Sequence, residues 1–333
     1  MKYFKLTPSS VQVKRCRPTY GIASLASKLF MAGRVLYAKS RSILTVGVGV
    51  VTLIFVFTTG SAYAVTVDSG DWTAPTPGVD LGFIYQQYAS RSDLYVNGNK
   101  TLSNADLNSY VTILRYTHPI SIGGFVVNPQ FLLPFGTLKA EGNMAALGKT
   151  SGFGDLILAA PIWLVNKPKE HTYLSIAPYL FLPTGSYDKN RPLNLGENRW
   201  KGDLQVGAMI GLGKKFSTEL TGDVMWYGNN TKFGSASATL KQDQSFQVQA
   251  YLNWYYTPTT TLAIGSSWTS GGTQSVDSLS QNNPIGTTSA ILTASTWVDK
   301  HTQLMFSFGR DLSVRNGFKE DTRFNIRLLR AFF

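Results

Sequence analysis

Apolar and polar residues alternate with a period of two along most of the chain after residue 78. In the clearest case, residues 244–256, one side carries Phe246, Val248, Ala250, Leu252 and Trp254, and the other carries Gln247, Gln249, Tyr251, Asn253 and Tyr255. This alternation is typical of a β-strand with two unlike faces, and no segment of the region reads as a long amphipathic helix. The pattern therefore predicts an all-β protein.

Twelve candidate strands of about ten residues follow from this pattern. They lie at 79–89, 107–117, 124–134, 153–165, 172–183, 201–213, 216–227, 244–256, 261–270, 288–298, 302–312 and 322–333. Short connections at 118–123, 166–171, 214–215, 257–260 and 299–301 alternate with long ones at 90–106, 135–152, 184–200, 228–243, 271–287 and 313–321. Transmembrane β-barrels combine an even strand number with short periplasmic turns and longer extracellular loops. A soluble sandwich would also alternate, but it requires no such asymmetry. The sequence predicts a transmembrane antiparallel up-and-down β-barrel of about 12 strands over residues 79–333.

The first 64 residues differ in charge from the rest of the chain. They contain nine basic residues and no acidic one, and they include an uncharged run at 43–57 followed by Ala62-Tyr63-Ala64. A basic region, an apolar stretch and an A-x-A site are typical of a secretory signal, so we expect cleavage after Ala64 and export to the Gram-negative outer membrane. The alternative is a single transmembrane anchor, for which the run is short. Translation could start at Met1 or at Met31.

Removal of this leader changes the charge balance. The remaining 269 residues carry 22 basic residues (31 less the nine) and 19 acidic ones, a net charge of +3. The basic total therefore gives little support to nucleic-acid binding. The only cysteine, Cys16, lies in the leader, and His118, His171 and His301 fall in or beside predicted turns without metal-ligand spacing. We expect no metal and no other cofactor.

Aromatic residues fit the boundary of a bilayer. Five tryptophans fall near predicted strand ends or in their outer turns, namely Trp163, Trp226, Trp254, Trp268 and Trp297. Aromatic girdles at both membrane interfaces are a feature of outer-membrane barrels. The expected partners of the outer face are therefore outer-membrane lipids.

Charged and amide side chains fall on the faces predicted to point inward. They are Asp80, Arg115, Asp155, Asp203, Glu219, Asp223, Gln247, Gln249, Asn253, Arg323 and Arg327. Such groups either line a water-filled lumen and set its selectivity or pair into a network that fills the interior, and both readings stay open. Predicted inward Ile84, Ile157, Met209 and Tyr251 indicate an amphipathic passage. The stretch 65–78 is expected to form a small plug or to hang free.

Three motifs resemble a known family. They are GFGDL at 152–156, PYLFLPTGSY at 178–187 and NLGENRW at 194–200. In order and spacing they are similar to the outer-membrane proteins of meta-pathway phenol degradation, over roughly residues 78–333. The resemblance implies a monomeric-type β-barrel linked to uptake of aromatic or other hydrophobic compounds, and it supplies no catalytic residues.

The expected function is passive uptake of small hydrophobic or aromatic solutes, in a barrel inserted by the barrel assembly machinery. One alternative is an outer-membrane lipid hydrolase, which would need a serine and a histidine at one depth on one face. Another is a surface adhesin or a structural barrel that acts through loops 184–200 and 271–287. Nucleic acid is not an expected partner.

Overall fold

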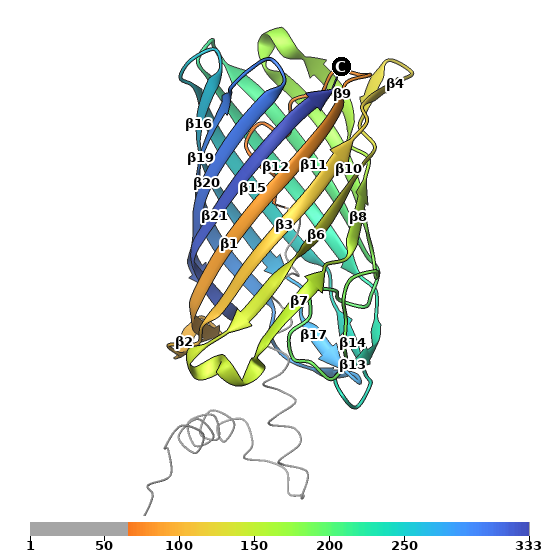
Figure 1. The fold of residues 1–333 in the computed structure, drawn as a ribbon, viewed down its shortest axis with the longest axis vertical. Coiled ribbons are helices and arrows are strands. Elements are labelled where there is room, and N and C mark those ends of the chain that lie inside the picture. The colour runs from red at the N-terminus through yellow and green to blue at the C-terminus, as the bar shows by residue number, and fades with distance from the viewer. Residues whose placement is uncertain (1–65, 333) are drawn as a thin grey trace, which may run out of the picture. The chain divides into compact units, whose positions relative to one another are not determined.

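The computed structural model describes residues 66–332, which form a closed antiparallel barrel (Figure 1). The wall strands are β1 (Asp80–Val96), β3 (Leu107–Thr117), β6 (Gln130–Ala140), β8 (Leu156–Ala159) continued by β9 (Ile162–Lys167), β10 (Thr172–Leu182), β11 (Lys201–Leu212), β12 (Phe216–Tyr227), β15 (Ser245–Tyr255), β16 (Thr260–Gly271), β19 (Ile285–Trp297), β20 (Thr302–Val314) and β21 (Gly317–Phe332). With β8 and β9 taken as one interrupted strand, the wall has 12 strands, so the predicted fold class is confirmed.

The smaller elements lie in the connections. They are β2 (Asn99–Leu102), β4 (Ile120–Ile122), β5 (Phe125–Val127), β7 (Lys149–Phe153), β13 (Asn230–Phe233), β14 (Ala238–Gln242), β17 (Gln274–Val276), β18 (Leu279–Ser280) and the 3-10 helices η2 (Gly142–Leu147) and η3 (Pro168–Glu170). Strands β13, β14, β17 and β18 form a separate sheet of four strands at the end opposite the C-terminus (Figure 1). In residues 66–332 no helix has the length and apolar character needed to cross a bilayer.

The first and last strands close the ring. Strand β1 pairs with β21 from Asp80 opposite Phe332 to Tyr95 opposite Gly317, and β1 pairs with β3 on its other side. Backbone N–H and C=O groups find no water in hydrocarbon, so a sheet that spans a membrane must close and leave no edge. The long pairing of β1 with β21 meets this requirement.

Two predicted connections are wrong. The third strand begins at Gln130 and not at 124, because residues 120–127 form the hairpin of β4 and β5, whose turn contains Gly123 and Gly124 at φ 57° and 85°. Glycine adopts such positive φ values without strain. At the other end, β20 and β21 extend beyond their predicted limits until only residues 315–316 join them. The alternation fades there because polar residues fall on both faces at Lys319, Glu320 and Asp321.

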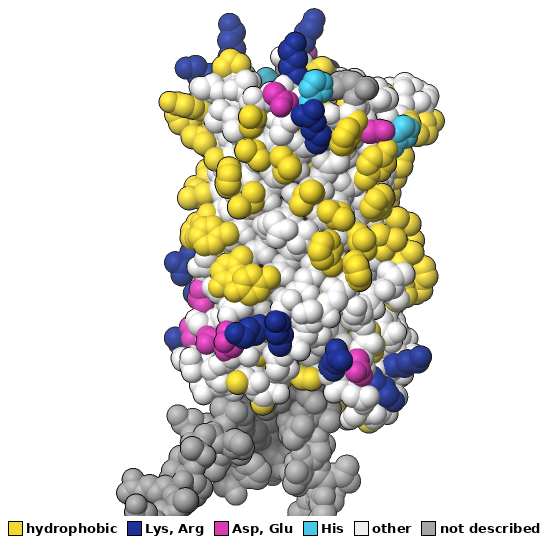
Figure 2. Space-filling view, viewed as in Figure 1, with side chains coloured by type: hydrophobic (Ala, Val, Ile, Leu, Met, Phe, Trp, Pro, Cys, Tyr) yellow, Lys and Arg dark blue, Asp and Glu magenta, His cyan; other side chains and the backbone are white. Residues whose placement is uncertain are grey.

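The barrel has an apolar outside and a largely polar inside. Leu220, Ile264 and Phe306 on the outer face are exposed, whereas Gln205, Glu219 and Gln249 on the inner face are buried. Figure 2 shows apolar side chains gathered in a broad band between two charged ends. This is the distribution expected when lipid surrounds the sheet.

Three of the five predicted girdle tryptophans point outward, one is buried inside the barrel, and Trp297 is exposed at the end of β19, where it also borders the internal cavity described below. Trp226, Trp254 and Trp268 are exposed, whereas Trp163 is only 3% exposed and lies inside the barrel. The inward side of Trp163 follows the alternation itself, because Ile157 in β8 and Trp163 in β9 both line the interior while Leu158 and Leu164 are exposed.

Leu220 tests the lipid-facing assignment. It lies near the middle of β12 and is 58% exposed, so Leu220→Arg should place a charge in hydrocarbon. We expect a loss of about 2–4 kcal/mol in the free energy of unfolding from lipid vesicles, measured by denaturant titration. Leu279→Arg, at a residue of β18 that is 71% exposed, is the matched control and should have little effect. Equal effects of the two changes would contradict the assignment.

Candidate functional site

Residues 66–79, here named the plug segment, run inside the barrel before β1 begins. The Val67 N–H donates to Gln249 Oε1 (3.2 Å), and Gln249 Nε2 donates back to the Val67 carbonyl (2.7 Å). The Ser69 hydroxyl donates to Asn253 Oδ1 (2.8 Å), and the Gly70 N–H donates to Glu219 Oε1 (2.8 Å). The backbone of the plug segment thereby satisfies its polar groups on β12 and β15.

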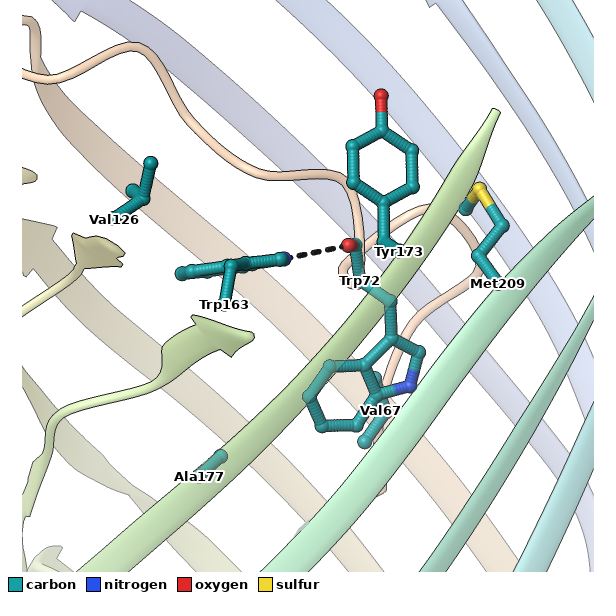
Figure 3. Packing of buried hydrophobic residues seen from close by; sticks show 7 residues of the cluster. All are labelled: Val67, Trp72, Val126, Trp163, Tyr173, Ala177 and Met209. Atoms are coloured by element: carbon teal, nitrogen blue, oxygen red, sulfur yellow. Dashed lines mark hydrogen bonds between the residues drawn. The ribbon is translucent and has the colours of Figure 1, made fainter. Parts of the chain in front are cut away.

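Trp72 anchors the plug segment in an aromatic cluster (Figure 3). Its indole N–H donates to Thr221 Oγ1 (2.7 Å), and Trp163 Nε1 donates to the Trp72 carbonyl (2.7 Å). The buried cluster consists of Val67, Trp72, Val126, Trp163, Tyr173, Ala177 and Met209. A Cβ atom at Gly207 would lie 1.9 Å from the Trp72 ring, so the indole rests directly against the backbone of β11.

Two arginines of the wall hold the carboxylates of the plug segment. Arg327 Nη1 lies 2.7 Å from Asp71 and 3.2 Å from Asp68, and Arg115 Nη1 lies 3.1 Å from Asp71. Both guanidinium groups lie near the ring of Phe83, with Cζ 4.7 Å (Arg115) and 5.8 Å (Arg327) from its centroid. Buried charges are stable only when they are paired, and here two carboxylates balance two arginines.

The structure gathers five of the predicted inward residues around the plug segment: Arg115, Glu219, Gln249, Asn253 and Arg327. Gln247 donates to Asp223 (3.3 Å) farther along β15, and buried Asp203 lies on neighbouring β11. Asp155 instead accepts the N–H groups of Gly185 and Glu197, both at 3.0 Å, and Arg323 pairs with Glu320 at 2.6 Å.

The predicted inward positions of Asp80 and Ile84 are wrong. Ile84 is exposed on the outer face, and Asp80 pairs with His118 at 2.5 Å near the barrel rim. The buried side chains of β1 include Phe83 and Tyr85, which pack with Leu329 inside the barrel. The alternation placed the apolar face of Leu81, Phe83 and Tyr85 towards lipid, but in this strand that face packs inside the barrel.

A buried ion cluster at the base of loop 183–200 was not foreseen. Arg199 Nη2 lies 2.6 Å from Glu197 and donates to Gln242 Oε1 (2.6 Å), and Lys201 Nζ also contacts Glu197. Burial opposes the charge of Glu197, but Lys201 and Arg199 outweigh it and lower the pKa of this carboxyl to about 2. The only signal in the sequence was one acidic and two basic residues at every second position, Glu197, Arg199 and Lys201.

A cavity of about 820 Å³ remains beside the plug segment. Its wall combines apolar and aromatic side chains with the paired groups just described, and includes Ile113, Ile157, Tyr179, Phe181 and Leu329. Ligand pockets are typically apolar with a few placed polar groups. Within the described residues no group of His, Cys, Asp and Glu has the arrangement to hold a metal ion.

Residues 90–328 match the model of the family described as "Putative MetA-pathway of phenol degradation". The chain belongs to this family. An outer membrane channel from Pseudomonas putida F1 is 41% identical, over 80% of this chain and 100% of the channel, with a TM-score of 0.78. The beta domain of the Bordetella autotransporter Brka shares the fold at 12% identity, over 76% of this chain and 99% of that domain, with a TM-score of 0.50. No curated protein matches the chain.

Gly207→Ala should displace Trp72 and loosen the plug segment, because the added methyl overlaps the indole. Overpacking costs about 1–3 kcal/mol, so a cysteine reporter at Ser69 should react about tenfold faster with a water-soluble maleimide. Gly222→Ala on β12 is the control, since a Cβ atom there meets nothing within 4 Å. Unchanged labelling in Gly207→Ala would contradict the packing of Trp72 against β11.

The low pKa of Glu197 predicts how loop 183–200 responds to acid. Ion pairing stabilises the loop fully above the ordinary carboxyl pKa of 4.5 and is lost as the pH falls towards about 2. Protection of the loop amides from hydrogen exchange should therefore stay high at pH 4 and fall near pH 2. Glu197→Gln should cost about 3–5 kcal/mol and open the loop at neutral pH. Loss of protection near pH 4.5 in the unchanged protein would contradict this account.

Proposed function

We propose that this protein is an outer-membrane channel for passive uptake of small hydrophobic or aromatic compounds, linked to their degradation. The family membership and the similar Pseudomonas channel support a transport role. The proposal also includes a leader cleaved after Ala64 and insertion by the barrel assembly machinery. Residues 1–64, Val65 and Phe333 lie outside the described residues.

The internal cavity is the observation that carries the proposal. It has room for a small organic molecule, and its aromatic and aliphatic side chains can make apolar contacts with that molecule. Arg115 and Arg327 lie beside it, but the carboxylates of Asp68 and Asp71 neutralise them. A lumen with paired charges gives little attraction to free ions, whereas apolar solutes gain by leaving water.

The histidine contacts favour this role over lipid hydrolysis. His118 pairs with Asp80 at the rim, and the ring of His171 stacks on that of Tyr255 at 4.5 Å. Both contacts are structural, and both lie at the end with the short turns. The similar Pseudomonas protein named above is a channel, which agrees with a function that is not enzymatic.

Adjacent residues of β3 provide a matched test. Ile113 lines the cavity, whereas Leu114 points to lipid and is exposed. In Gram-negative cells that express the protein, uptake of the fluorescent aromatic probe N-phenyl-1-naphthylamine should be faster than in cells without it. Ile113→Trp should remove most of this increase by filling the cavity, and Leu114→Trp should preserve it.

Folding of each variant is checked by comparing gel mobility with and without boiling. Uptake no faster than in cells without the protein would contradict the proposed function. Equal loss in the two variants would contradict the cavity as the route.

A further inference from the structure

Two lysines stand side by side on the outer face of the barrel, at the end with the long loops. Lys139 of β6 and Lys149 of β7 are register partners, and both are exposed. Their chain neighbours Leu138, Ala140 and Thr150 are buried, so the two lysines point outward. Like charges directly opposite each other destabilise a strand pair. This arrangement is therefore favourable only where an anion lies close by.

Acidic neighbours balance only part of this charge. Glu141 lies 2.7 Å from Lys139 and accepts from Asn108 Nδ2 (3.4 Å) on β3. In the part of the chain that the structure describes, Lys149 has no ion pair within 4.0 Å. By contrast, Lys100 of β2 pairs with Asp93 of β1 at 3.1 Å. Lys139 and Lys149 therefore carry more positive charge than Glu141 balances.

Away from the two lysines, the outward side chains of β6 and β7 change in chemical type from one row of register partners to the next. The row next to them contains Tyr110, Thr137 and Ser151, with a hydrogen bond of 2.8 Å between the last two. The following row contains Phe135 and Phe153, whose ring centroids are 5.8 Å apart. Basic, then hydroxyl-bearing, then aromatic side chains reproduce the order of layers from headgroup to hydrocarbon.

The spacing sets the depth of the lysines. Lys139 lies four residues beyond Phe135, which is about 13 Å along a strand. With the usual strand tilt this becomes about 10 Å along the membrane normal, which is headgroup depth. Figure 2 shows charged side chains at this end directly beyond the apolar band. Long loops lie on the extracellular side of outer-membrane barrels, so the row faces the outer leaflet.

We propose that Lys139 and Lys149, with Asn108, bind the phosphate groups of the phosphorylated glycolipid of the outer leaflet, lipid A. The phosphate supplies the anion that Lys149 lacks beside its neighbour Lys139, and Asn108 adds a neutral donor. The acyl chains then lie along Phe135, Phe153 and the apolar band. This site is on the outer wall and does not depend on transport through the lumen.

The test measures lipid binding by purified, detergent-solubilised protein. Diphosphorylated lipid A should raise the midpoint of thermal unfolding, and Lys139→Gln/Lys149→Gln should bind it about tenfold to thirtyfold more weakly. Lys214→Gln/Lys215→Gln, at the short turn between β11 and β12, is the control and should bind like the unchanged protein. Lipid A without phosphate should give no shift with any of the proteins.

Three outcomes would overturn the proposal. They are equal binding by the double variant and the unchanged protein, equal weakening in the control, and an equal shift with phosphatidylglycerol, which would indicate attraction to any anionic lipid. If the double variant fails to fold, Lys149→Gln alone is used, since that lysine lacks an ion pair. Its binding should still fall, and binding to the unchanged protein should weaken with added salt.

Discussion

The structure depends on the requirement that no backbone polar group face hydrocarbon unpaired. The pairing of β1 with β21 meets it by joining the two ends of the sheet. Once the ring is closed, the pleat sends alternate side chains to lipid and to the lumen. The outer set must be apolar, so the inner set is the only place within the membrane where charged side chains can be held.

The interior then has its own requirement. Buried charges and amides need partners, and the inner wall carries more of them than it can pair across the lumen. The plug segment supplies partners: its carboxylates pair with Arg115 and Arg327, its backbone bonds Gln249 and Glu219, and the Ser69 hydroxyl donates to Asn253. What remains is a cavity with paired charges and an apolar wall, suited to a neutral solute. The same inward residues can therefore both pair with one another and influence which solutes enter the lumen.

The sequence was informative where the two faces of a strand differ sharply. In β15, amides alternate with apolar residues, and both the bounds and the inward face were predicted. It was misleading in β1, where Phe83 and Tyr85 point inward, and around β4 and β5, where a hairpin interrupts the alternation. The contacts of the plug segment could not be predicted, because Asp71 and Arg327 are 256 positions apart and only closure of the ring brings them together.

The partners of the plug segment also impose an order on assembly. Asp71 bridges Arg115 on β3, the second wall strand, and Arg327 on β21, the last. Its second ion pair cannot form until the C-terminal strand has been synthesised, exported and laid against β1. Loop closure over so many residues carries a large entropy cost and slows folding. Docking of the plug segment and sealing of the barrel are thus one late, coupled event, and a half-built barrel keeps an unfilled lumen.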